Sequence, residues 1–130
     1  MHKLALATAA VFLAFSASAM AASQSWNVTE ESAAGIKSAQ GKWLLKSEGD
    51  NLSGSATLQR DNGTEVTYSV EGSVKDGVYT VKLDKRSDEK KGCVWTGHAQ
   101  AATALGRATG YIGDVVCEGA KFIVRAQPSS

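Results

Sequence analysis

From Gly41 toward the C-terminus, apolar and polar residues alternate in short runs, and turn signals separate these runs at roughly ten-residue intervals. Alternation of this kind is typical of strands that bury one face, and no segment keeps the longer period of an amphipathic helix. The pattern predicts an all-β fold, an antiparallel up-and-down meander of about seven or eight strands. One apolar face continues through these strands, so we expect the sheet to close as a small barrel or barrel-like sandwich.

The turns set the register between neighbouring strands, because a shift of one residue moves every side chain to the opposite face. A three-residue turn at 61–63 places Leu58 opposite Val66. A two-residue turn at 76–77 likewise matches the apolar residues of its two strands. The predicted apolar face comprises Trp43, Leu45, Leu58, Val66, Tyr68, Val70, Tyr79, Val81, Leu83, Trp95, Tyr111, Val115, Phe122 and Val124.

The N-terminus has the pattern of a secretory leader. An apolar run of about a dozen residues follows Lys3, whereas a membrane span needs roughly 20. Small residues then offer cleavage before Met20 or before Ala22. We therefore expect residues 1–21 to be a bacterial-type signal peptide. The mature chain of about 109 residues is then periplasmic or secreted, with no membrane span of its own.

The mature chain is long enough for one domain with one core. Residues 22–40 are predicted to be a lead-in with a short helix, because Thr29 can cap it and acidic residues follow in its first turn. Residues 41–126 are assigned to the β-barrel-like domain and 127–130 to a C-terminal tail. The pattern gives about seven strands, so an eighth comes from the lead-in or from a break in the segment before Cys117.

Charge becomes balanced once the leader is removed. Without Lys3, thirteen basic residues face thirteen acidic residues. Such a surface has no general attraction to nucleic acid or to anionic lipid. The chain also lacks a basic stripe with interleaved aromatic residues, so nucleic-acid binding is not expected.

Cys93 and Cys117 are the only cysteines. A hairpin that turns at Leu105 places them opposite each other and also places Gly97 opposite Gly113. In an oxidising compartment they are expected to form a disulfide, which contributes roughly 3–4 kcal/mol in the chain-entropy model. No Cys-x-x-Cys motif favours a redox role.

Few residues suggest catalysis. His98 is the only histidine after cleavage, and it is predicted to point outward from its strand. The pairs Glu30-Glu31 and Asp88-Glu89 are interpreted as solvated charges of a helix start and a loop. No set of zinc ligands and no nucleophile with a matching acid and base stand at recognisable spacing. We therefore expect no catalytic activity, no metal and no cofactor.

Aromatic residues are the most suggestive group on the predicted inward face. They can fill the interior of a small barrel as an ordinary core. They can also line a cup at its mouth that holds a small apolar molecule. The candidate ligand-binding residues are Trp43, Tyr68, Tyr79, Trp95 and Tyr111.

The sequence Gly41-Lys42-Trp43 resembles the Gly-x-Trp opening of the calycin barrels, which include lipocalins and avidins. The sequence Val94-Trp95-Thr96-Gly97 is similar to a Trp-Ser-Gly strand of the avidins. Arg125 is similar to the basic residue that packs on the calycin tryptophan, although the predicted register turns it outward. The resemblance spans 41–126 and implies a small exported β-barrel; no ligand is carried over.

Two functions fit these observations. The first is non-catalytic binding of a small apolar ligand in the barrel, with the five aromatic residues as walls. The second is a protein-interaction module or enzyme inhibitor of the cell envelope, which makes contact through the loops at 48–51 and 85–92. An open apolar cavity favours the first function, and a filled interior favours the second.

Overall fold

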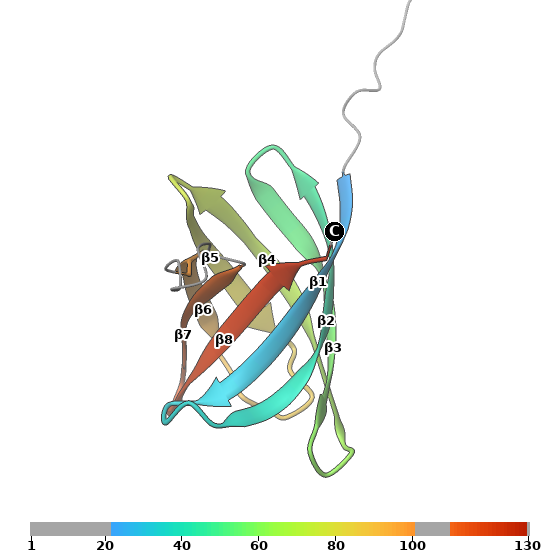
Figure 1. Ribbon diagram of the computed structural model, residues 1–130, viewed down its shortest axis with the longest axis vertical. Coiled ribbons are helices and arrows are strands. Elements are labelled where there is room, and N and C mark those ends of the chain that lie inside the picture. Colours follow the sequence, from blue (N-terminus) through green and yellow to red (C-terminus); the bar gives the residue numbers. More distant parts are fainter. Residues whose placement is uncertain (1–21, 101–109, 130) are drawn as a thin grey trace, which may run out of the picture.

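A computed structural model describes residues 22–100 and 110–129. Each strand is antiparallel to the one before it, and the last pairs with the first to close a barrel (Figure 1). The strands are β1 (Ala22–Ser32), β2 (Lys37–Glu48), β3 (Asn51–Arg60), β4 (Glu65–Lys75), β5 (Val78–Asp84), β6 (Val94–Ala99), β7 (Tyr111–Cys117) and β8 (Ala120–Pro128). The predicted all-β meander is confirmed. The described part of the chain contains no helix with the length and apolar character needed to cross a bilayer.

The lead-in forms a strand, and the predicted short helix is wrong. β1 pairs with β2 along one side and with β8 along the other, and it supplies the eighth strand. Its side chains alternate, with Trp26, Val28 and Glu30 buried inside the barrel. A capping signal at Thr29 is a weak local preference, whereas pairing on both sides satisfies the backbone and removes two sheet edges. The barrel therefore extends from Ala22 to Pro128.

The predicted registers of β3 with β4, β4 with β5 and β6 with β7 are confirmed. Leu58 pairs with Val66 across a three-residue turn, and Gly63 has a φ of 87° there. In the two-residue turn at 76–77, both residues have positive φ, as in the turn type whose twist matches a hairpin. Tyr79 and Tyr111 are half-buried, and the other residues of the predicted apolar face are buried.

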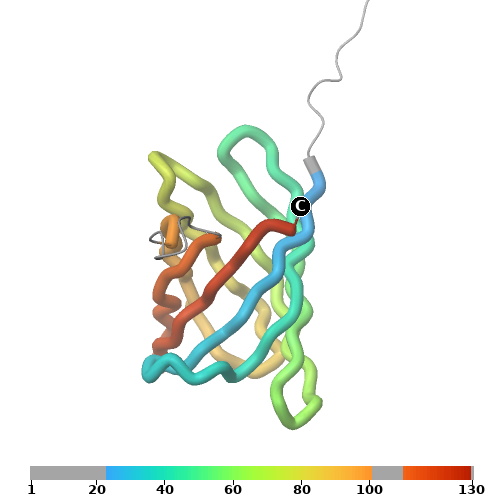
Figure 2. Tube along the Cα trace, viewed as in Figure 1, coloured from blue at the N-terminus to red at the C-terminus, as the bar shows by residue number. Residues whose placement is uncertain are grey.

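Figure 2 shows how the connections divide between the two ends of the barrel. One end carries the turns after β1, β3 and β7 together with the longer loop between β5 and β6. The opposite end carries the turns after β2 and β4 and the start of β1. The predicted turn at Leu105 lies outside the described residues.

The hairpin of β6 and β7 combines a disulfide with two facing glycines. Cys93 and Cys117 are bonded as predicted, and both are buried. Gly97 pairs with Gly113. A Cβ at Gly113 would collide with the backbone of the neighbouring strand, and one at Gly97 would collide with the ring of Trp95. The glycines therefore permit close coiling of the strands and leave room for a large ring.

Candidate functional site

The aromatic residues form a continuous stack inside the barrel. Trp43, Tyr68 and Trp95 are buried, while Tyr79 and Tyr111 keep part of their surface exposed. The structure thus brings the five candidate ligand-binding residues into one interior. It places only the two half-buried tyrosines within reach of solvent.

Trp26 joins the members of this stack, and sequence reasoning missed it. Its ring centroid lies 6.3 Å from that of Trp43, 5.7 Å from Tyr79 and 5.6 Å from Tyr111. The rings of Tyr79 and Tyr111 are 4.8 Å apart. Trp43 and Trp95 meet edge to face at 5.3 Å. These spacings are those of aromatic rings in mutual contact, so the rings occupy much of the interior themselves.

The polar atoms of the stack find partners within the protein. Trp43 Nε1 donates to the Tyr68 hydroxyl oxygen at 2.9 Å, and Trp95 Nε1 donates to the carbonyl of Val124 at 3.2 Å. Burial raises the pKa of Tyr68 well above its usual value, and nearby Glu30 adds to the effect. Burial, together with the adjacent Tyr111 hydroxyl, raises the pKa of Tyr79 to about 12. Both phenols therefore stay neutral at physiological pH.

A buried ionic cluster closes the end of the barrel that carries the loop between β5 and β6. Arg86 donates from Nη1 and Nη2 to the two carboxylate oxygens of Glu30, at 3.0 and 3.1 Å. Its Nε and Nη2 also donate to the two oxygens of Asp88, at 2.9 and 2.8 Å. The three side chains are only 1–6 % exposed. One guanidinium thus satisfies two carboxylates in the fork geometry that arginine favours.

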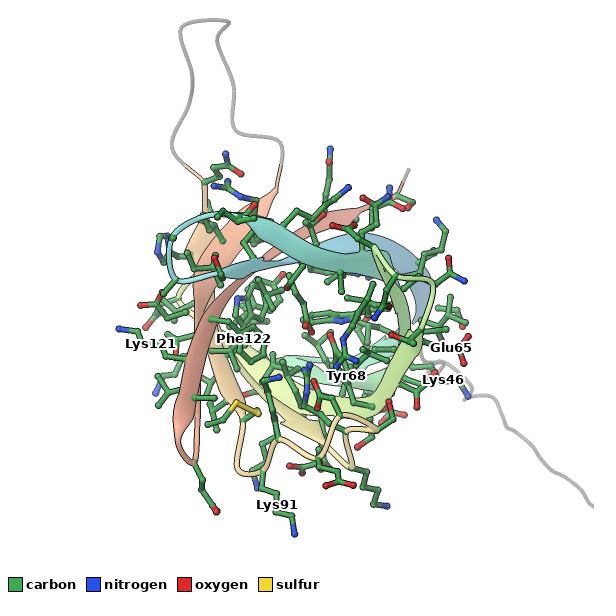
Figure 3. The ribbon with its side chains drawn as sticks, turned by 90° about the horizontal axis from the view of Figure 1, so that it is seen from below. Lys46, Glu65, Tyr68, Lys91, Lys121 and Phe122 are labelled. Atoms are coloured by element: carbon green, nitrogen blue, oxygen red, sulfur yellow. A yellow bond between two sulfur atoms is a disulfide. The ribbon has the colours of Figure 1, made fainter. Side chains whose placement is uncertain are left out.

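Aromatic rings enclose the cluster from within the barrel. The Arg86 guanidinium carbon lies 4.6 Å from the ring centroid of Tyr68 and 5.0 Å from that of Phe122. Viewed from this end, Tyr68 and Phe122 point inside the ring of strands, whereas Lys91 and Lys121 point away from it (Figure 3). Cation–π contacts of this kind gain strength when water is excluded. The guanidinium therefore packs as part of the core as well as pairing with the carboxylates.

The charges of the cluster stabilise one another. Burial alone would raise the pKa of Asp88, but the hydrogen bonds and charge of Arg86 outweigh it and hold that pKa well below its usual range. Burial alone would lower the pKa of Arg86, but Asp88 and Glu30 hold it above its usual value. Lys90 adds a further contact, 3.2 Å from an Asp88 oxygen. Asp88 and Arg86 therefore stay charged at neutral pH.

This arrangement predicts a specific loss of stability in acid. Because the folded-state pKa of Asp88 is depressed, its contribution is complete above its unfolded pKa of about 3.9 and is lost as pH falls toward the folded value. Asp88→Asn is expected to have a lower free energy of unfolding than the wild type at neutral pH. This difference in free energy, the gap, narrows below about pH 4. Urea unfolding at a series of pH values measures this gap. Asp61→Asn, in an exposed turn, is the control, and parallel curves for wild type and Asp88→Asn would contradict the prediction.

The cluster also fixes the loop at residues 85–92, here called the anchored loop. Besides the buried guanidinium, Ser87 exchanges hydrogen bonds with Thr67 on β4, at 2.9 and 3.0 Å. The amide of Glu118, in the turn after β7, donates to the carbonyl of Lys91 at 2.8 Å. The anchored loop is thus attached to the barrel at separate points along its length.

The anchored loop exposes basic side chains in an unusual backbone conformation. Lys85, Glu89 and Lys91 are exposed, and Lys90 is half-buried. Lys85 and Glu89 have φ values of 57° and 68°, in the left-handed region that residues other than glycine rarely adopt. A surface hollow of about 440 Å³ lies between these side chains. The loop therefore presents three lysines and one glutamate on a constrained frame.

Two interpretations of charged residues are corrected by the structure. Glu30 and Asp88 were expected to be solvated, but both side chains are buried against Arg86. The signal for Glu30 is its alternation with Trp26 and Val28, which places it on the inward face once this segment is treated as a strand. No comparable signal marks Arg86, because its partner Glu30 lies 56 residues away in the sequence.

The remaining candidates stay on the outside. His98 is exposed on β6, as predicted. Arg125 pairs with Glu31 on the outer surface, Nε to Oε2 2.6 Å, so it does not pack on Trp43 as the calycin resemblance implies. The loop at 48–51 is reduced to a short turn between β2 and β3.

The architecture, an eight-stranded antiparallel meander that closes as a barrel, is consistent with the calycin folds. Within 22–100 and 110–129, no three His, Cys, Asp or Glu side chains are grouped in a way that could hold a metal ion. No protein-family model, no curated protein and no solved structure matches this chain with statistical significance.

Proposed function

We propose that this chain is a non-catalytic protein-binding module of the cell envelope that engages its partner through the anchored loop. The observation that carries the proposal is the attachment of this loop to β1, β4 and the turn after β7, while its lysines remain exposed. A loop that is already ordered loses little conformational entropy on binding, which favours affinity. Rigid β-scaffolds often present function on their loops.

The backbone of the anchored loop supports the same proposal. Left-handed φ values at residues other than glycine cost free energy, and such residues cluster at functional sites. Lys85 and Glu89 both have this conformation, and the buried cluster at Arg86 holds the backbone between them. The conformation is therefore built into the barrel end, where it displays side chains in a fixed arrangement.

The charge of the anchored loop suggests the chemistry of the partner. Lys85, Lys90 and Lys91 outnumber the single acidic residue exposed there, Glu89. Complementary charge favours association with an acidic protein surface, such as the cleft of an extracellular enzyme that this chain would inhibit. The leader pattern and the disulfide support an exported, periplasmic or secreted location, where such a partner would be met.

Binding of a small apolar ligand at the barrel end opposite the anchored loop is the second candidate function. It is favoured by Tyr79 and Tyr111, which contact the ring of Trp26 and keep part of their surface exposed. This function would also fit a calycin-like barrel. It ranks second because Trp43, Tyr68 and Trp95 are already covered by other groups. A small molecule retained in native mass spectrometry would favour it over the first.

Site-specific photo-cross-linking in the producing cell tests the first function. A photoreactive residue at Glu89 is expected to form an adduct with one protein, and the same residue at Thr57, on the outer face of β3, is not. The double charge reversal Lys85→Glu/Lys91→Glu is expected to abolish the adduct, because the new glutamates would repel an acidic partner surface.

The matched control is Lys46→Glu/Lys75→Glu, which makes the same change of charge at exposed positions away from the anchored loop. This variant is expected to keep the adduct. An adduct that survives Lys85→Glu/Lys91→Glu, or one that also forms at Thr57, would show that the anchored loop is not the contact.

A further inference from the structure

The outer face of β7 and β8 carries four side chains in an alternating arrangement. Val116 pairs across the strands with Lys121, and Asp114 pairs with Ile123. The apolar residues thus occupy one diagonal of a small rectangle, and the charged residues occupy the other. Val116 is 56 % exposed, and Asp114 and Lys121 have similar exposure. Lys121 Nζ lies 3.7 Å from an Asp114 oxygen, so the charged diagonal is loosely paired.

This rectangle lies on an outer surface where Val116 is exposed and Ile112 and Ile123 are half-buried. It borders a hollow of about 550 Å³, whose walls include Ile112 on β7 and Thr96 on β6. The outer face of β3 is polar by contrast and presents Ser53, Ser55, Thr57 and Gln59. Branched apolar residues that keep part of their surface exposed and gather on one sheet face mark an interaction surface more often than scattered ones do.

We propose that this face binds a second copy of the chain, face to face, about a two-fold axis along the diagonal from Val116 to Ile123. This axis lies in the plane of the interface. A residue on the axis therefore meets the same residue of the second copy. A residue beside the axis meets the residue of the second copy that lies at the same distance on the other side of the axis. Val116 then meets Val116 of the second copy, and Ile123 meets Ile123. Asp114 meets Lys121 of the second copy, and Lys121 meets Asp114. The rectangle is therefore complementary to itself.

A second ion pair on this face is arranged in the same way about the proposed two-fold axis. Arg125 lies two residues beyond Ile123 on β8, and Glu31 pairs with Ile123 from β1. These two residues form an ion pair within one chain, and the diagonal axis carries Arg125 opposite Glu31 of the second copy. Under this one two-fold axis, each charged residue of both ion pairs lies opposite its oppositely charged partner residue in the second copy. No like charges of these pairs are in contact.

A two-fold axis along either strand does not share this property. An axis that runs along β7 would place Asp114 against Asp114, and one along β8 would place Lys121 against Lys121. Like charges in direct contact disfavour association. Exposed ion pairs contribute little affinity, so apolar contact supplies most of it and the charges select the arrangement.

Sedimentation velocity of the chain from Ala22, with its disulfide formed, tests the proposal. The wild type is expected to be in reversible monomer–dimer equilibrium. Asp114→Lys and Lys121→Asp are each expected to weaken dimerisation about tenfold or more, because each creates two contacts between like charges. An equal mixture of the two variants is expected to restore the dimer, because one chain then has lysine at both charged corners and the other has aspartate at both.

A second measurement uses the position on the axis. Val116→Cys is expected to form a symmetric cross-link between two chains on oxidation, whereas Thr57→Cys, on the polar face, is not. The proposal is overturned if the wild type stays monomeric at every concentration, if the two charge variants dimerise as well as the wild type, or if their mixture does not recover. Lys85→Glu/Lys91→Glu is expected to dimerise normally, so this result is independent of the anchored loop's function.

Discussion

Replacing Arg86 with methionine is expected to lower the free energy of unfolding by about 3–5 kcal/mol, because it leaves the buried Glu30 without its counter-charge and removes two hydrogen bonds to the buried Asp88. Glu30 accepts two hydrogen bonds from this guanidinium, whereas Asp88 also accepts hydrogen bonds from Lys90. Small domains have a total stability of about 5–15 kcal/mol, so the loss is a large share of the whole. Urea unfolding at neutral pH measures it by linear extrapolation.

Arg125→Met provides the matched control for this result. Arg125 is also paired with a glutamate, but its side chain is 41 % exposed, and such surface pairs contribute about 0–1 kcal/mol. The triple variant Glu30→Gln/Arg86→Met/Asp88→Asn removes the charges together and is expected to recover part of the loss. If Arg86→Met unfolds like Arg125→Met, the cluster does not have the role assigned to it.

Loss of the disulfide is expected to have an effect of similar size. Cys93→Ala/Cys117→Ala should lower the free energy of unfolding by roughly 3–4 kcal/mol, because the cross-link restricts the unfolded chain between two cysteines 24 residues apart. The bond also fixes the chain directly after the anchored loop. Thermal or urea unfolding of the double variant, compared with the oxidised wild type, measures the change.

Reduction of the wild-type protein serves as an independent check on the same quantity. Reduced wild type and the double alanine variant should unfold at similar denaturant concentrations. Mass spectrometry should find no alkylated thiol in the native protein until a reductant is added. Two thiols that react without reduction would show that the bond is not formed.

The parts of the fold that could be predicted from the sequence are those set by adjacent strands. The hairpins β3–β4 and β4–β5 each have their own turn signal and their own apolar matching, so a pair such as Leu58 and Val66 could be identified locally. β1 could not be identified in this way, because its partners are β2 and the distant β8. Local capping residues at Thr29 and Glu30 favoured a helix instead.

The candidate site was harder to predict for the same reason. The five aromatic residues follow from strand alternation, but Trp26 belongs to the strand that was missed. The ionic cluster joins β1 to the loop after β5, and a charged residue in a loop normally predicts a solvated side chain. Only the closed barrel brings Glu30 and Arg86 together, so their roles depend on tertiary contacts that no local pattern contains.

Closure of the barrel between β1 and β8 has a consequence for the order of folding. β1 is the first strand of the domain to be synthesised, and its partner β8 is the last. The pairing of Trp26 with Pro128 spans nearly the whole described chain, and contacts of such high sequence separation form slowly. β2 to β8 can form hairpins one after another, but Arg86 has only Asp88 as a buried partner until β1 brings Glu30 into place. Ring closure and the pairing of Glu30 with Arg86 are therefore the same late event.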